Sequence, residues 1–274
     1  MMDTPHSFFS SKRVRVFAHR GGAALAPENT VAAFDNALAL GADGLELDVH
    51  LSRDGVVVVH HDRTLDRTTN LRGPVAERTA AEMARADAGH AFRHGDTYPF
   101  RGRGIGVPTL AEVLARYRDV PIIIELKVNS VEMARAAVAV VRAADAVDRA
   151  CFGSYGLRVL RAARALEPAI ATSAAREEVR WALYRSWIRW PVSRVAYGGY
   201  QVPEHAGRTR VVSPRFIKAA RRAQLGVQVW TVDAEDDARR LLGWGADALI
   251  TDRPDRIVPV VRRVRSPLPS LPMP

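Results

Sequence analysis

The chain has 274 residues, of which 47% are hydrophobic and 26% are charged, which is typical of a globular protein with a large core and excludes a disordered chain. This length corresponds to one or two domains, and a single α/β barrel of about 250 residues would account for nearly all of it. The net charge is +10, and the chain has no run of about 18 apolar residues that could form a transmembrane helix.

Short β-branched runs alternate with Ala-, Leu- and Arg-rich segments of helical pattern along most of the chain. The patterns predict strands over 14–18, 44–51, 56–60, 121–128, 150–155, 169–173, 194–201, 227–232 and 248–251. They predict helices over 27–40, 109–118, 131–146, 157–166, 175–190, 214–224 and 234–244, with Pro27 in the first turn of the first helix and Gly41 as its stop. This alternation indicates a parallel sheet covered by helices, and the number of repeats, close to eight, favours a closed (β/α)8 TIM barrel over an open doubly wound sheet. No Gly-rich dinucleotide fingerprint follows the first strand, which also disfavours the open sheet.

The predicted barrel covers residues 14–262 and is preceded by an N-terminal arm over 1–13. Residues 64–106 have little periodicity, and we interpret them as a small insertion after an early strand that lies over one mouth of the barrel. Residues 266–274 contain four prolines and predict a disordered tail.

Acidic side chains fall at alternate positions near the ends of two predicted strands. Residues two apart in a strand face the same side, so Glu46 and Asp48 point one way together, as do Glu125 and Lys127. A structural ion pair explains either pair alone. Three carboxylates at the carboxyl ends of barrel strands instead predict one divalent cation, Mg²⁺ or Ca²⁺, because these hard cations prefer oxygen ligands.

Histidines also end two predicted strands. His19 and Arg20 end the first, and His60 and His61 end the third. A single histidine at a strand end is more often a structural hydrogen-bonding residue, but two of them beside three carboxylates could form an acid/base pair around a cation. Arg20 and Lys127 would then suit a phosphate oxygen. His50 shares the face of the acidic pair by spacing but lies further out, so we predict a peripheral position for it.

The order of several motifs resembles the glycerophosphodiester phosphodiesterase family over nearly the whole folded chain. The matching stretches are His19-Arg20-Gly21-Gly22, Pro27-Glu28-Asn29-Thr30, Phe34, Gly41-Ala42-Asp43, Glu46-x-Asp48-Val49, Asp54-Gly55, His61-Asp62, Arg67-Thr68-Thr69, Pro108-Thr109-Leu110, Glu125-Leu126-Lys127, Ser154, Gln228-Val229-Trp230-Thr231-Val232 and Thr251-Asp252-Arg253-Pro254. Two departures are Asp233, where the family usually has Asn, and Ala220-Arg221, where many relatives have Ala-His. Neither is expected to touch the catalytic centre.

The resemblance implies a barrel with its site at the strand carboxyl ends and hydrolysis of a glycerophosphodiester to glycerol 3-phosphate and an alcohol. In this reading one histidine deprotonates the middle glycerol hydroxyl, which attacks phosphorus within the same molecule, and the other protonates the leaving alcohol. Water then opens the cyclic phosphate.

By the same resemblance, the metal ligands are Glu46, Asp48 and Glu125, the acid/base pair is His19 and His61, and the substrate contacts are Arg20, Lys127 and Trp230. Glu28 either supports this site or binds the metal, or it is only a carboxylate in the first turn of a helix. Trp230 could instead plug the barrel mouth.

Two other functions compete with hydrolysis of a soluble diester. One is a lysophospholipase D with the same site acting on lysophospholipids, and the other is a non-catalytic anion-binding protein. Residues 176–222 carry eleven Lys or Arg against three Glu, which fits an anionic partner or simply solvated helix faces. No nucleic-acid partner is predicted.

A cluster of aromatic residues lies in the same basic stretch. Trp181, Trp187 and Trp190 stand beside tyrosine and arginine, so the helix could contact a membrane surface or a lysolipid. Aromatic stripes at helical spacing more often pack into the core, which is the alternative.

The compartment is predicted from two further features. The only cysteine, Cys151, cannot form an internal disulfide and has an apolar setting that predicts burial. The N-terminal residues lack the apolar segment of a secretory signal. We therefore expect a cytoplasmic protein, with peripheral membrane contact as an option. The sequence leaves open the alcohol, the preferred cation, which histidine is the acid, and the oligomeric state.

Overall fold

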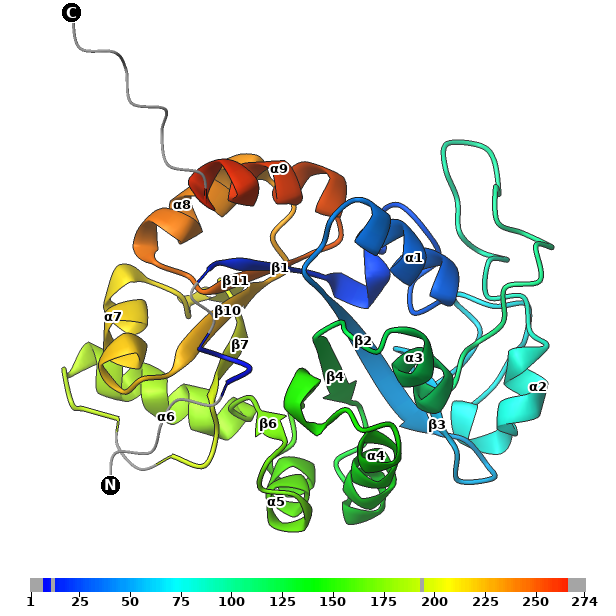
Figure 1. Ribbon diagram of the computed structural model, residues 1–274, viewed down its shortest axis with the longest axis horizontal. Helices are drawn as coiled ribbons and strands as arrows, with labels where there is room; N and C mark the ends of the chain where they lie inside the picture. The colour runs from blue at the N-terminus through cyan, green and yellow to red at the C-terminus, as the bar shows by residue number, and fades with distance from the viewer. Residues whose placement is uncertain (1–6, 11–12, 193–194, 266–274) are drawn as a thin grey trace, which may run out of the picture.

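The computed structural model describes residues 7–10, 13–192 and 195–265, and its parallel strands form a barrel (Figure 1). The eight strands are β1 (Arg15–Ala18), β2 (Gly44–Leu51), β4 (Ile122–Leu126), β5 (Ala150–Gly153), β6 (Ala171–Thr172), β7 (Gly199–Pro203), β10 (Gly226–Trp230) and β11 (Ala248–Thr251). They follow the order β6-β5-β4-β2-β1-β11-β10-β7, and a parallel bridge between Ser173 and Gly199 joins the two ends of that path. The predicted TIM barrel is confirmed.

Helices surround the barrel in Figure 1. They are α1 (Val31–Ala39), α3 (Leu110–Arg116), α4 (Val131–Ala143), α5 (Leu157–Leu166), α6 (Arg176–Trp187), α7 (Pro214–Arg222), α8 (Glu235–Trp244) and α9 (Pro254–Arg265). Short 3-10 turns lie at η1 (His19–Gly21), η2 (Val75–Glu77) and η3 (Val147–Arg149), and a small hairpin joins β8 (His205–Ala206) to β9 (Thr209–Arg210). No helix in the described part of the chain is long and apolar enough to cross a membrane.

Strand alternation divides the side chains of β2 between two environments. Leu45 and Leu47 are fully buried in the layer between strands and helices, where they belong to the same core as Phe34. Glu46 and Asp48 alternate with them and therefore point to the barrel interior. At the amino ends of the strands that interior is apolar, and Phe9 of the N-terminal arm fills it, so the functional groups are confined to the other end.

The predicted strand over 56–60 is not a barrel strand. Its observed form, β3 (Val57–Val59), pairs antiparallel with the outer half of β2. The reason is the tight turn at Asp54-Gly55, where Gly55 has a φ of +76°, which folds the chain straight back and leaves no room for a crossover helix. The predicted helix over 27–40 also starts later than expected, at Val31, because the Thr30 hydroxyl accepts the amide of Ala33 and caps the helix there.

The remaining differences concern segments with weak patterns. Helix α9 is an addition to the predicted helices, and it contains Pro259 in its interior. The predicted strand over 194–201 is observed as Gly199–Pro203, and residues 193–194 lie outside the described residues. Within the predicted insertion, α2 (Ala80–Ala84) packs with Leu65 and Val75 into a small core beside β3. The predicted tail and residues 1–6 and 11–12 of the predicted arm also lie outside the described residues.

Candidate active site

A cavity of about 590 Å³ opens at the carboxyl ends of the barrel strands. His19, Glu46, His61, Glu125 and Trp230 all line it. Five residues that the sequence places far apart therefore meet at one mouth of the barrel.

The three predicted metal ligands lie close together at this cavity, whose lining includes Glu46 and Glu125, with the buried Asp48 beside them. One carboxylate oxygen from each of Glu46, Asp48 and Glu125 lies within 4.8 Å of the others. The register explains this closeness, because Asp48 on β2 is paired directly with Glu125 on β4. Asn29 fixes Asp48 from behind, donating its side-chain amide to the carboxylate (2.9 Å) and accepting the Asp48 backbone amide (3.1 Å).

The electrostatics of the cluster favour a cation. Burial raises the pKa of the Glu46 carboxyl from 4.5 to about 8, and the charge of Asp48 adds to the rise. Burial also raises the pKa of Glu125, against the opposing effect of Lys127. Crowded carboxylates of this kind are stabilised when a cation shares their charge. The donor set is all oxygen, which suits Mg²⁺ or Ca²⁺.

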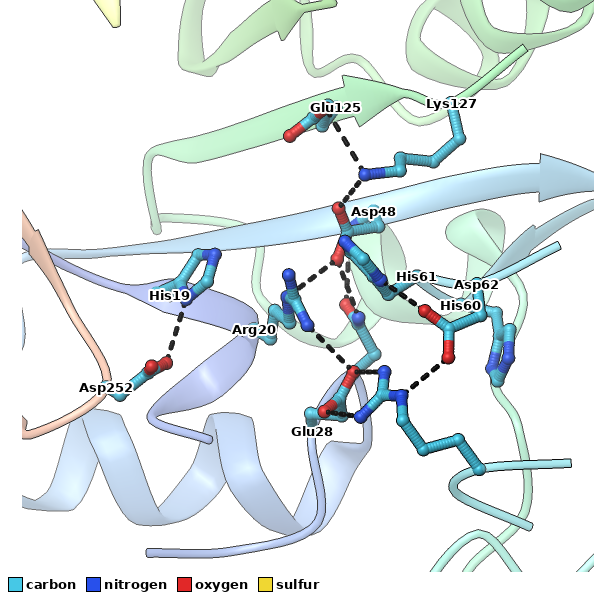
Figure 2. A network of polar contacts seen from close by, with 12 residues as sticks. His19, Arg20, Glu28, Asp48, His60, His61, Asp62, Glu125, Lys127 and Asp252 are labelled. Carbon is cyan, nitrogen blue, oxygen red and sulfur yellow. Dashed lines mark hydrogen bonds and ion pairs between the residues drawn. The ribbon is translucent and has the colours of Figure 1, made fainter. Parts of the chain in front are cut away.

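His19 lies on one side of the carboxylates and is held by Asp252 (Figure 2). Its Nδ1 is 2.8 Å from the Asp252 carboxylate, which leaves Nε2 facing the cavity, 3.9 Å from Glu46. Burial acts to lower the pKa of His19, but the charge of Glu46 and the hydrogen bond to Asp252 outweigh it and raise the pKa to about 9. The backbone reaches this position through a tight turn in which Gly21 has a φ of +83°, and a Cβ there would collide with Ala33 at 2.7 Å.

His61 lies on the other side and has a carboxylate partner of its own (Figure 2). Its Nδ1 is 2.6 Å from Asp62, and Asp62 in turn accepts a hydrogen bond from Arg67. Arg67 is also bidentate to Glu28, with both contacts at 2.7 Å. Despite the opposing effect of burial, Arg67 and His61 hold the pKa of Asp62 well below its usual range. Each histidine is therefore oriented through Nδ1 by a carboxylate.

The two predicted phosphate contacts lie next to the carboxylates. Lys127 Nζ is 3.3 Å from both Asp48 and Glu125. Arg20 pairs with Glu28 through Nη1 (3.1 Å), while its Nε is 3.3 Å from Asp48. This Nε is buried and faces the Asp48 carboxylate as an ion pair, but it makes no hydrogen bond among the described residues.

A match to the Glycerophosphoryl diester phosphodiesterase family spans residues 19–256 and so includes every residue of this site. The chain belongs to this family. A glycerophosphodiester phosphodiesterase of Caldanaerobacter subterraneus subsp. tengcongensis is 30% identical over 90% of this chain and 98% of its own.

Solved structures agree with this family. A glycerophosphodiester phosphodiesterase from Agrobacterium tumefaciens is 31% identical, covers 90% of this chain and 99% of its own, and superposes with a TM-score of 0.74. A phosphodiesterase from Oleispira antarctica, solved in complex with the product sn-glycerol-3-phosphate, is 28% identical with a TM-score of 0.73 over 90% of this chain and 96% of its own. The chain is a phosphoric diester hydrolase of this family, which confirms the predicted enzyme class.

The structure adds partners of the two histidines that had no assigned role in the sequence analysis. Asp252, Asp62 and Arg67 all fall inside the family motifs, yet only the fold shows their partners. Asp252 holds His19, Asp62 holds His61, and Arg67 in turn holds Asp62. His50 does not line the cavity, in keeping with its predicted peripheral position. It is buried, and its Nε2 contacts the backbone carbonyl of His61 at 3.0 Å. Because β3 pairs antiparallel with β2, His50 lies opposite Val58, and its side chain contacts the carbonyl of His61 beyond the end of β3.

Three further residues named from the sequence have contacts that place them around the site. Glu28 pairs with Arg20 and Arg67 and lies outside the three-carboxylate cluster, so it takes the supporting position. Trp230 lines the cavity wall and packs edge-on against Tyr155. Asp233, where the family usually has Asn, contacts a residue of the site directly. Its carboxylate accepts a hydrogen bond from the backbone amide of Asp252.

Proposed function

We propose that this enzyme hydrolyses glycerophosphodiesters to glycerol 3-phosphate and an alcohol, with one divalent cation held by Glu46, Asp48 and Glu125. The observation that carries the proposal is the convergence of these three carboxylates within 4.8 Å, between two histidines that each have a carboxylate at Nδ1. The product seen in the Oleispira relative supports the same cleavage here.

The protein side chains have separate tasks in this proposal. When bound, the cation supplies the Lewis acidity that polarises the phosphodiester. One of His19 and His61 takes the proton of the middle glycerol hydroxyl, which attacks phosphorus, and the other donates a proton to the leaving alcohol oxygen. The cyclic phosphate is then opened by water with the two roles reversed. Arg20 and Lys127 contact the phosphate, and Trp230 borders the glycerol or the leaving group.

The test is release of glycerol 3-phosphate from glycerophosphocholine, with added Mg²⁺ or Ca²⁺ and with EDTA. We expect hydrolysis that EDTA abolishes and an excess of the active cation restores. Full activity in EDTA would contradict the cation assignment, and no activity with either cation would contradict the proposed substrate.

A lysophospholipase D reaction at the same site has one specific observation in its favour. One wall of the cavity is apolar and includes Val179, Val202, Ala206 and Val211. Such a wall could accommodate part of an acyl chain. Assaying lysophosphatidylcholine beside glycerophosphocholine separates the two substrates, because only the lysolipid gains from apolar contact.

We also propose peripheral contact with a membrane or lysolipid through Trp181, Trp187 and Trp190, in a protein of the cytoplasm. The alternative that these rings pack inward is wrong, because all three are exposed and the buried face of α6 consists of Ala182, Leu183 and Ser186. A reducing compartment is supported by the single cysteine, Cys151, which is buried as predicted.

A further inference from the structure

A second cavity, of about 580 Å³, lies outside the active site, between the end of α6 and α7. These two helices are neighbours at the left of Figure 1. The cavity has a strongly cationic lining with no acidic residue, and its charged members are Arg185, Arg189, Arg215, Lys218 and Arg222.

Within the part of the chain that the structure describes, these five cations differ from several outer arginines in having no carboxylate partner, and from isolated unpaired arginines, such as Arg135 on α4, in lining one hollow together. Arg142, Arg164 and Arg240 all have carboxylate partners at 2.6–2.8 Å. Among the described residues, none of the five cavity cations forms an ion pair or a side-chain hydrogen bond. Five positive charges facing one hollow repel one another, so an anion placed there would be stabilised by all of them.

Helix electrostatics account for only part of this arrangement. A cation in the last turn of a helix is favourable, which would explain Arg185 on α6 and Arg222 on α7. Arg215 instead stands in the first turn of α7, where the helix dipole disfavours positive charge and where no acidic residue balances it. Its position is therefore better explained by a ligand than by stability of the helix.

The rim of the cavity carries exposed aromatic and aliphatic side chains. Trp190 lines the cavity and is 62% exposed, while Trp187 and Ile188 beside it are 48% and 71% exposed. Of the eight large hydrophobic side chains that are exposed in the described part of the chain, five lie within residues 181–190. Tryptophan and tyrosine favour the boundary between lipid and water, and cations beside them attract anionic head groups.

We propose that the α6–α7 cavity binds the phosphate groups of anionic phospholipids at a membrane surface, with the exposed side chains of residues 181–190 at the lipid–water boundary. The inference rests on the proposed membrane contact and not on the catalytic mechanism. A bilayer is favoured over a nucleic acid because bases stack on aromatic rings but gain little from an exposed aliphatic chain such as Ile188. The first turns of α6 reach the active site through Arg176 and Val179, so one helix joins the two cavities.

The test compares binding of the full-length enzyme to vesicles of phosphatidylcholine alone and of phosphatidylcholine with phosphatidylglycerol. We expect binding at least about tenfold stronger with the anionic lipid, weakening as salt rises. Arg185→Gln/Lys218→Gln/Arg222→Gln should lose most of this preference, since each cation near an anionic surface is worth about fivefold in affinity. The matched control, Arg135→Gln/Arg158→Gln/Arg161→Gln, removes the same charge from exposed positions on α4 and α5 and should retain the preference.

A third variant separates the cavity from the aromatic contact. Trp181→Ala/Trp187→Ala changes two exposed rings that do not line the cavity and should weaken binding to both kinds of vesicle. Equal binding of the wild type to the two vesicles would overturn the anion cavity while leaving the membrane contact standing, and no binding to either would overturn both.

Two other outcomes would also overturn the cavity. One is an equal loss in the control variant, which would mean that only net charge matters, and the other is binding of single-stranded RNA with the same variant dependence but no vesicle binding. Hydrolysis of glycerophosphocholine should be unchanged in the cavity variant, which confirms its fold. If the wild type fails to hydrolyse that substrate, the proposed function fails and the vesicle result still stands.

Discussion

The active site and the α6–α7 cavity are both rich in charge, but their balances are opposite. The active-site cavity and the groups linked to its lining by ion pairs contain six carboxylates and four permanent cations, Arg20, Arg67, Lys127 and Arg176. The first three of these cations each lie within 3.3 Å of a carboxylate. The carboxylates are Glu28, Glu46, Asp48, Asp62, Glu125 and Asp252. The α6–α7 cavity has five cations and no carboxylate in its lining.

This difference points to different ligands. Where cations are already paired and carboxylates remain in excess, the missing charge is positive, which is the condition of a metal site. Where cations have no partners, the missing charge is negative. The sign of the charge that is in excess at a site therefore indicates its ligand better than the total number of charges does. The following experiments change single groups at these sites.

The largest effect is expected for the two histidines. His19→Ala and His61→Ala should each lower turnover by about two to four powers of ten, because each removes a proton-transfer group. The double variant should cost far less than the product of the single effects, since both groups act on one step. Steady-state kinetics with glycerophosphocholine measures this, and near-normal turnover in either single variant would disprove the pair.

The second largest effect is expected when one of the three clustered carboxylates loses its charge. Glu125→Gln keeps the shape of the side chain but should weaken divalent-cation binding by more than about 100-fold, with a matching fall in turnover at low cation. Without cation, the variant should be no less stable than the wild type, because a repulsive charge is gone. Calorimetric titration and thermal unfolding check both parts. Unchanged cation affinity would remove Glu125 from the metal site.

Asp252 allows the positioning of His19 to be tested separately. Asp252→Asn should lower the pKa of His19 below about 9 and reduce turnover by about 10- to 100-fold, because the carboxylate both orients the ring and favours its charged form. An NMR titration of His19 and a pH–rate profile measure the two effects. Asp255→Asn, whose carboxylate binds Arg253 instead, is the control. If the pKa of His19 stays at about 9 in Asp252→Asn and turnover is unchanged, Asp252 does not position His19 for catalysis.

The smallest effect is a change of stability with pH. In the cation-free protein the folded pKa values of Glu46 and His19, about 8 and about 9, lie above their usual 4.5 and 6.5. The fold then binds protons more tightly than the unfolded chain, so the stability from these groups is complete below the usual values and is lost as the pH rises through 8 and 9.

A cation competes with the Glu46 proton, so added Mg²⁺ or Ca²⁺ should raise the melting temperature more at pH 9 than at pH 6, by about 4 °C. Differential scanning fluorimetry at both pH values measures this. An equal rise at both would mean that the cation does not bind at Glu46.

Sequence patterns predicted the barrel and most of the site because their information is local. Alternation along β2 places Leu45 and Leu47 against the helices and Glu46 and Asp48 inside, whatever the neighbouring strands are. Parallel strands end at one mouth, so residues at strand ends could be grouped before their contacts were known. The antiparallel strand β3 was harder to predict, because its sequence resembles that of a barrel strand and only its pairing with β2 distinguishes it.

By itself, the sequence determined the fold class, the face on which the carboxylates lie and the residues of the family motifs. Only the tertiary structure decided which carboxylate serves which histidine, because Asp252 and His19 are 233 positions apart and meet only when β11 closes on β1. It also decided the orientation of α6. Helical spacing gives the stripe of rings that includes Trp181, but whether a stripe is buried depends on which face the barrel covers, and here the barrel covers the face of Ala182, Leu183 and Ser186.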